Sequence, residues 1–99
     1  MAKFQNFKII KLWNGSQSSG NIVVNNISDY DLIGIQIKCT AGSFSSTQWH
    51  YYQTFLNFEH RVIIINEQDI KYKLTTSGIS ITRQGGVTSY ITNIFGIKF

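Results

Sequence analysis

The sequence predicts an all-β protein, an antiparallel and jelly-roll-like β-sandwich of about seven to nine short strands. Its composition favours pleated strands, with 16 isoleucines, eight threonines and four valines against four leucines and two alanines. Short stretches alternate between apolar and polar residues, and clusters of small polar residues separate them. With 99 residues, the chain from 1 to 99 is expected to form a single domain.

The first half of the chain predicts three strands. The apolar stretch at 7–13 is one strand, and the segment 14–20 after it consists of residues that turns prefer. The short apolar segment 21–25 predicts a second strand. The clearest signal lies at 32–39, where isoleucine at every second position shares one face and glycine, glutamine and lysine share the other.

The middle of the chain is rich in aromatic and aliphatic residues. A loop of small residues is expected at 41–47, followed by an aromatic-rich stretch at 48–58. A bend at 57–60 leads to the aliphatic run at 61–66, which is typical of a strand buried on both faces.

The last third predicts a hairpin and a closing strand. Alternation at 70–76 indicates a strand, and the dipeptide 77–78, with glycine second, joins it to the next strand at 79–83. A final strand is expected at 87–99, with Gly96 as a bulge or bend.

The predicted strands leave sheet edges that need protection. No proline occurs in the chain, and proline is one residue that blocks an exposed edge. Lysines within strands are one substitute, and pairing with further copies of the chain is another. Because the chain is also rich in isoleucine and aromatic residues, we expect a homo-oligomer.

Charge and hydropathy argue against two classes of partner. Nine lysines and arginines against five acidic residues give a net charge of +4, but the basic residues are spread along the chain, which disfavours nucleic-acid binding. The apolar run at 62–65 is far shorter than the roughly 20 residues of a membrane helix, and no secretory signal opens the sequence. We expect a product made in the cytoplasm, with no nucleic-acid partner and no membrane insertion.

The residues that carry chemistry form no catalytic pattern. His50 and His60 lack the spacing of a zinc site, so we expect solvent-facing or hydrogen-bonded structural histidines. Cys39, the single cysteine, is expected to be a buried thiol on the inward face of its strand. Asp29 and Asp31 fall in a predicted turn, where aspartate commonly caps the backbone. We therefore expect that the protein is not an enzyme and that it binds no metal ion and no cofactor.

An aromatic cluster is the candidate binding site. Trp49, His50, Tyr51 and Tyr52 follow a loop rich in serine and threonine. Aromatic rings beside hydroxyl and amide groups hold sugars, because ring faces pack on C–H patches and polar groups fix the orientation. Alternation would place Trp49 and Tyr51 on one face of the strand and His50 and Tyr52 on the opposite face. The alternative interpretation is that one of these two faces packs the core.

Both ends of the chain carry a resemblance to a known group of proteins. The segment 12–24 contains a leucine-tryptophan pair, a glycine-serine loop and a short strand, and 28–33 places a tyrosine before an aliphatic strand. The segment 90–98 ends in isoleucine, phenylalanine, glycine, isoleucine and lysine. Together these segments resemble small β-sandwich domains in tail-fibre and other virion proteins of tailed bacteriophages.

The resemblance implies a virion protein. Its expected role is a tail, baseplate or fibre-associated module in host attachment, with a trimer favoured, other virion proteins as partners and host cell-surface polysaccharide as a ligand. Such domains usually end long fibres, whereas this one stands at the start of the sequence, so two alternatives stay open. They are a capsid decoration or head-fibre protein without a ligand, and a carbohydrate-binding module outside the particle.

Overall fold

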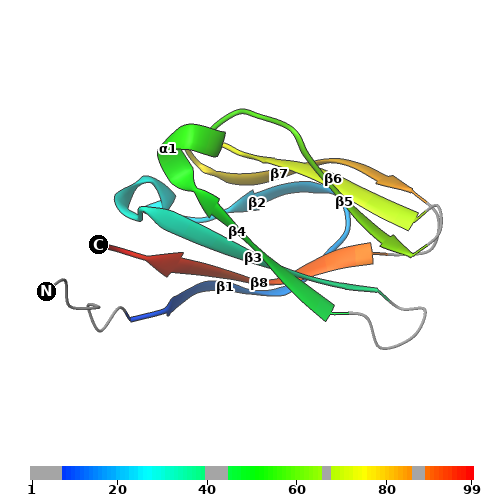
Figure 1. The fold of residues 1–99 in the computed structure, drawn as a ribbon, viewed down its shortest axis with the longest axis horizontal. Coiled ribbons are helices and arrows are strands. Elements are labelled where there is room, and N and C mark those ends of the chain that lie inside the picture. The colour runs from blue at the N-terminus through cyan, green and yellow to red at the C-terminus, as the bar shows by residue number, and fades with distance from the viewer. Residues whose placement is uncertain (1–7, 40–44, 66–67, 86–88) are drawn as a thin grey trace, which may run out of the picture.

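The computed structural model describes residues 8–39, 45–65, 68–85 and 89–99. These residues form two antiparallel four-stranded sheets that pack face to face (Figure 1). In spatial order, sheet A contains β1 (Ile10–Gln17), β8 (Ser89–Ile97), β3 (Leu32–Cys39) and β4 (Ser45–Tyr51). Sheet B contains β2 (Gly20–Val23), β7 (Gly78–Gly85), β6 (Gln68–Leu74) and β5 (His60–Ile65). The predicted all-β antiparallel sandwich is confirmed.

The connections decide which strands lie at the edges. β3 and β4 form a hairpin within sheet A, and β5, β6 and β7 form a meander within sheet B. The short helix α1 (Tyr52–Phe55) carries the chain from sheet A to sheet B, and a 3-10 turn at Ile27–Asp29 precedes β3. As a result, β1 and β4 are the edges of sheet A, and β2 and β5 are the edges of sheet B.

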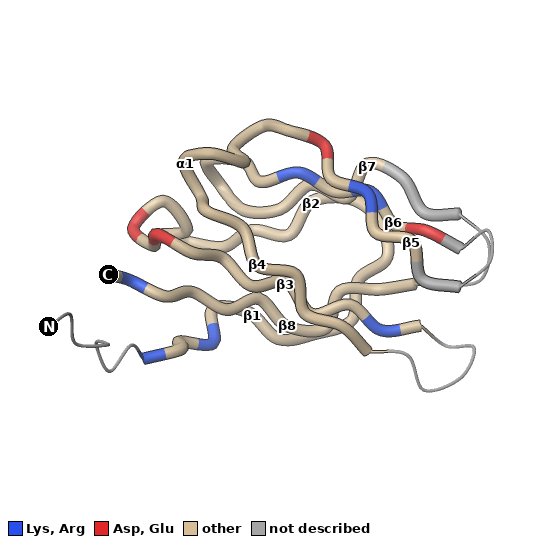
Figure 2. Tube along the Cα trace, in the orientation of Figure 1, with Lys and Arg blue, Asp and Glu red and all other residues tan. Residues whose placement is uncertain are grey.

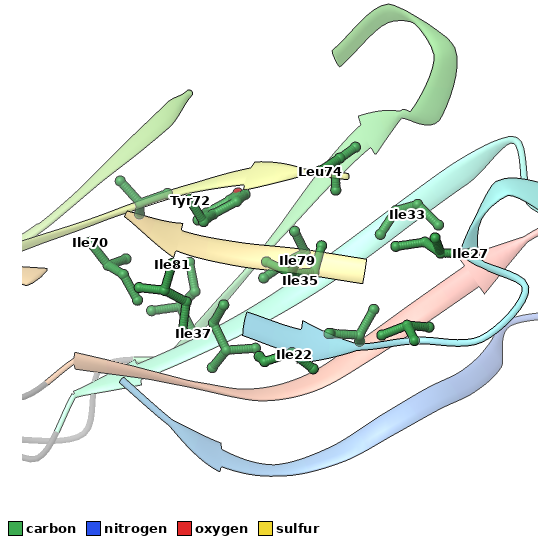
Figure 3. Packing of buried hydrophobic residues seen from close by; sticks show 14 of the residues in the cluster. Ile22, Ile27, Ile33, Ile35, Ile37, Ile70, Tyr72, Leu74, Ile79 and Ile81 are labelled. Atoms are coloured by element: carbon green, nitrogen blue, oxygen red, sulfur yellow. The ribbon is translucent and has the colours of Figure 1, made fainter. Parts of the chain in front are cut away.

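The core lies between the two sheets and consists mainly of isoleucine (Figure 3). The predicted alternation of β3 is confirmed, since Ile33, Ile35 and Ile37 are completely buried and point toward sheet B. From the other side β6 contributes Ile70 and Leu74, which are also buried. Each buried side chain of this size contributes about 1.5–3 kcal/mol, so these inward rows supply much of the driving force for the sandwich. The predicted burial of the Cys39 thiol, at the end of β3, is also confirmed.

Two predicted boundaries are wrong. The segment 14–17, predicted as part of a loop, belongs to β1, which accommodates its turn-type residues through two register shifts against β8. Residues 45–47, also predicted as loop, belong to β4, and residues 41–44 lie outside the described part of the chain. The aromatic stretch after β4 does not continue as a strand but turns into α1 at Tyr52.

Two predicted burial patterns need correction as well. The aliphatic run of β5 is not buried on both faces, because Val62 points into the core whereas Ile63, on the outer face of sheet B, is 60% exposed. Gly96 is not a bulge, since it pairs in regular register with Ile33. A side chain there would collide with Tyr30, whose ring lies 2.7 Å from the position of a Cβ atom, so the glycine permits close packing. The irregularity of β8 lies instead at Thr92.

Candidate functional site

The four residues of the predicted cluster divide between the outer face of sheet A and the interior of the sandwich. Trp49 and Tyr51 project from the outer side of sheet A, with 41% and 55% of their surfaces exposed. His50 points into the interior, and Tyr52, the first residue of α1, is buried and donates a 3.0 Å hydrogen bond from its hydroxyl to the carbonyl of Thr75. Burial removes His50 and Tyr52 from any surface site, so the expectation that all four contact a ligand is wrong for these two.

The two exposed rings belong to a larger aromatic surface. Trp49 lies opposite Gly34 on β3, and Gly34 lies opposite Phe95 on β8. The indole covers Gly34, because a Cβ atom at that glycine would approach the indole to 2.7 Å. The indole thereby reaches Phe95, with the ring centroids 6.4 Å apart and the planes inclined by 28°. A glycine in the central strand thus allows rings from two other strands to stack.

The second exposed ring extends this surface toward the end of the sheet. Tyr51 lies edge-to-face against Phe99, with the centroids 6.5 Å apart. The backbone N–H of Phe99, two residues beyond β8, donates to the Asp31 carboxylate over 2.6 Å, which holds the end of the chain beside the start of β3. We call Trp49, Tyr51, Phe95 and Phe99 the aromatic face.

A row of amide and hydroxyl groups borders the aromatic face. Gln36 on β3 lies two residues from Gly34 and pairs with Asn93 on β8, which in turn pairs with Asn14 on β1. The Asn93 amide donates to the side-chain oxygen of Gln36 over 2.5 Å, and the Asn14 amide donates to Asn93 over 2.8 Å. Thr92, at the irregularity of β8, donates its hydroxyl to the same oxygen of Gln36 over 3.0 Å. We call Asn14, Gln36, Thr92 and Asn93 the amide row.

The amide row is fixed before any ligand arrives. Each side chain is oriented by its neighbour, so the donors and acceptors that remain open keep their directions. Rigid rings beside pre-oriented amides are the groups that bind a polar molecule with apolar C–H faces, and saccharides are such molecules.

A second cluster lies at the seam between β4 and β5 and was missed by sequence reasoning; it consists of the buried His50 and Tyr72 and the half-buried Phe55 and His60. His50 on β4 shares a 2.6 Å hydrogen bond between its Nε2 and the hydroxyl of Tyr72 on β6. The ring of His60 on β5 lies 4.3 Å from that of His50, and Phe55 of α1 packs edge-on against both histidines. The predicted alternative of a hydrogen-bonded structural histidine is therefore correct for His50. The sequence offered one signal, the alternation of β4, which places residue 50 inward.

Burial sets the protonation of this seam cluster. Burial, and to a smaller extent the charge of His60, lowers the pKa of His50 to about 4. Burial also raises the pKa of the Tyr72 hydroxyl. At neutral pH both partners of the hydrogen bond are uncharged, as their low-polarity surroundings require.

Charged residues occur on both sheets, and one group of them lies on and beside β5 and β6 of sheet B (Figure 2). Arg61 contacts the buried carboxylate of Asp69 over 2.5 Å, and Lys71 lies 3.5 Å from Glu59. Glu59 also accepts a hydrogen bond from Thr82 over 2.6 Å, and this bond contributes most to lowering its pKa. These contacts are structural ion pairs and do not extend to the aromatic face.

The described residues contain no group of three or more side chains suited to hold a metal ion, and no helix among them is long and apolar enough to cross a membrane. Comparison of the chain with models of known families, with curated proteins and with solved structures found no match.

Proposed function

We propose that this chain is a non-catalytic module of a tailed-phage particle that takes part in host attachment by binding cell-surface saccharide through the aromatic face. The observation that carries the saccharide part is the side-by-side arrangement of the aromatic face and the amide row on the outer side of sheet A. Pyranose rings present apolar C–H faces and a rim of hydroxyls, and this arrangement offers a partner for each.

The geometry favours an extended chain of sugars over a single small molecule. The aromatic face and the amide row lie on the surface of a sheet, and the rings run across β4 and β8 rather than around a cavity. A polymer can contact several rings at once, which compensates for the low affinity of each contact.

The particle part of the proposal depends on the resemblance of the chain ends. Parts of the segments that carry it lie side by side in the fold, because β1 pairs with β8, whereas residues 20–23 form β2 in sheet B. The leucine-tryptophan pair and the closing segment of the resemblance therefore belong to one strand pair of this chain.

Screening against an array of bacterial surface polysaccharides tests the saccharide part. We expect binding that Trp49→Ala weakens by about tenfold or more, equivalent to roughly 1.4 kcal/mol, because the indole is the largest exposed ring on the aromatic face. Phe58→Ala is the matched control, since Phe58 is exposed and lies in the segment between α1 and β5, off this face. Unchanged binding in folded Trp49→Ala protein would exclude the aromatic face as the site.

Mass spectrometry of purified particles tests the particle part. We expect the chain among the virion proteins at a fixed ratio to the others. Its absence from particles, together with intact saccharide binding, would favour a carbohydrate-binding module that acts outside the particle. Its presence without any saccharide binding would favour a decoration protein.

A further inference from the structure

The four sheet edges differ in how they are protected against pairing with another strand. β1 carries Lys11 and two register shifts, and β2 is only four residues long. β5 carries Arg61 and a register shift beyond Ile63. Charges, irregular register and short length are the features by which proteins prevent edge-to-edge association.

β4 has none of these features. Its seven residues include no charged residue and no proline, and they pair with β3 without any register shift. Among the described residues, β3 is the only strand that pairs with β4, so the opposite edge presents backbone donors and acceptors in a straight row. An edge of this kind is a template for one further antiparallel strand.

The ladder indicates which residues turn their backbone groups outward. The N–H of Tyr52 donates to the carbonyl of Asp31 over 2.9 Å, which continues the β3–β4 ladder by one step. In an antiparallel ladder every second residue bonds to the neighbouring strand. Residues 46, 48 and 50 thus face β3, whereas Thr47 and Trp49 direct their N–H and carbonyl groups away from the sheet.

We propose that this edge pairs with the β4 edge of a second copy of the chain, antiparallel and across a two-fold axis. A second copy fits because the pairing is self-complementary: the register that overlaps all seven residues places Gln48 on the axis and Thr47 of each copy beside Trp49 of the other. Charge also separates β4 from the other long edges. Each chain has a net charge of +4, so two copies repel, and β4 is the edge strand longer than four residues that has no charged residue.

The pairing would join two copies of sheet A into one eight-stranded sheet with both aromatic faces on the same side. It goes beyond the proposed function, since it requires no ligand. It also differs from the trimer that the sequence resemblance implies, because a two-fold strand pair closes with two copies.

Light scattering across a range of concentrations is the first test. We expect a mass twice the 11.3 kDa of the chain at high concentration, decreasing toward the single-chain mass on dilution. A single-chain mass at every concentration, or a persistent trimer, would overturn the proposal. The mass of the protein in solution is independent of saccharide binding. A failure of the strand-pairing proposal can therefore be distinguished from a failure of the proposed function.

Edge variants provide the second test. Thr47→Lys places a charge on the outer side of β4 in each copy, and Thr47→Pro removes an outward N–H without removing a bond to β3. We expect the single-chain mass for both, whereas Asn21→Lys, the same charge change on edge strand β2, should keep the doubled mass. If circular dichroism shows that the proline variant does not fold, the lysine variant decides. A doubled mass in folded Thr47→Lys protein would refute β4 as the interface.

Hydrogen exchange locates the contact residue by residue. The Trp49 amide should exchange about tenfold more slowly at high protein concentration than in the Thr47→Lys variant, because pairing protects an otherwise open edge. The Asn21 amide on β2 should exchange at the same rate in both. Equal exchange at Trp49 would refute the pairing even if the mass doubled.

Discussion

Acid should destabilise the sandwich through a single buried histidine. The pKa of His50 is lowered from 6.5 to about 4 in the folded protein, first because of burial and second because of His60. In the unfolded chain the imidazole regains its ordinary pKa, so the unfolded state binds a proton more readily between these values. The stabilising contribution of neutral His50 is fully present above about pH 6.5 and is lost as the pH falls toward 4.

The size of the effect follows from the shift. One pKa unit corresponds to about 1.4 kcal/mol, so a shift of about 2.5 units amounts to roughly 3 kcal/mol, of which about 2 to 3 kcal/mol is lost between pH 7 and pH 4.5. Small domains are stable by only about 5–15 kcal/mol, so the loss is a large share of the total. Protonated His50 would also face His60, whose ring lies 4.3 Å away, across the seam between the sheets.

Urea unfolding at the two pH values, followed by circular dichroism, measures the loss. His50→Gln is the comparison variant, because glutamine keeps a hydrogen-bonding group near Tyr72 but does not titrate. We expect the wild type to lose about 2 to 3 kcal/mol more than the variant on acidification. The reasoning is refuted if both proteins lose the same amount, or if nuclear magnetic resonance finds the pKa of His50 near 6.5.

Three further substitutions test the packing. Gly34→Val should displace the Trp49 indole, shift its fluorescence emission to the red and cost about 1–3 kcal/mol; an unchanged spectrum would contradict the stacked arrangement. Gly78→Ala should lower the Tm strongly in thermal unfolding, because φ of Gly78 is +152° and a Cβ atom there would overlap the carbonyl oxygen of Ile22. A Tm equal to that of the wild type would contradict this expectation. Ile35→Ala should cost about 2–5 kcal/mol in urea unfolding, whereas Val23→Ala, at an exposed position, should stay within about 0.5 kcal/mol; similar costs would contradict the assigned core.

The sequence predicted those parts of the fold that local chemistry determines. The alternation at 32–39 identified β3 and its buried face, since the period of a strand is a property of the backbone. The serine-glycine pair at 77–78 marked the connection between β6 and β7 to within one residue, since Gly78, predicted in the turn, is the first residue of β7. In both cases a few consecutive residues contain the whole signal.

The parts that failed depend on contacts between distant segments. The aliphatic run of β5 looked fully buried, but burial of its outer face would require another layer packed on sheet B, and Ile63 is exposed there. His50 and His60 lie ten residues apart in the sequence, and only the turn through α1 brings their rings together. The aromatic face likewise needs Phe95 from the far end of the chain, so residues 49–52 alone could not define it.

The position of β8 between β1 and β3 has a consequence for how the protein acquires its fold during synthesis. Among the strands of the described residues β1 is made first, but β8, its partner in sheet A, is made last. All strands of sheet B and of the β3–β4 hairpin are synthesised before β8, whereas β1 remains without its partner until β8 is complete. Strand pairs this distant in sequence form slowly and expose apolar segments in the interval. Nascent chains should therefore be most prone to aggregation, and most dependent on chaperones, just before β8 is added.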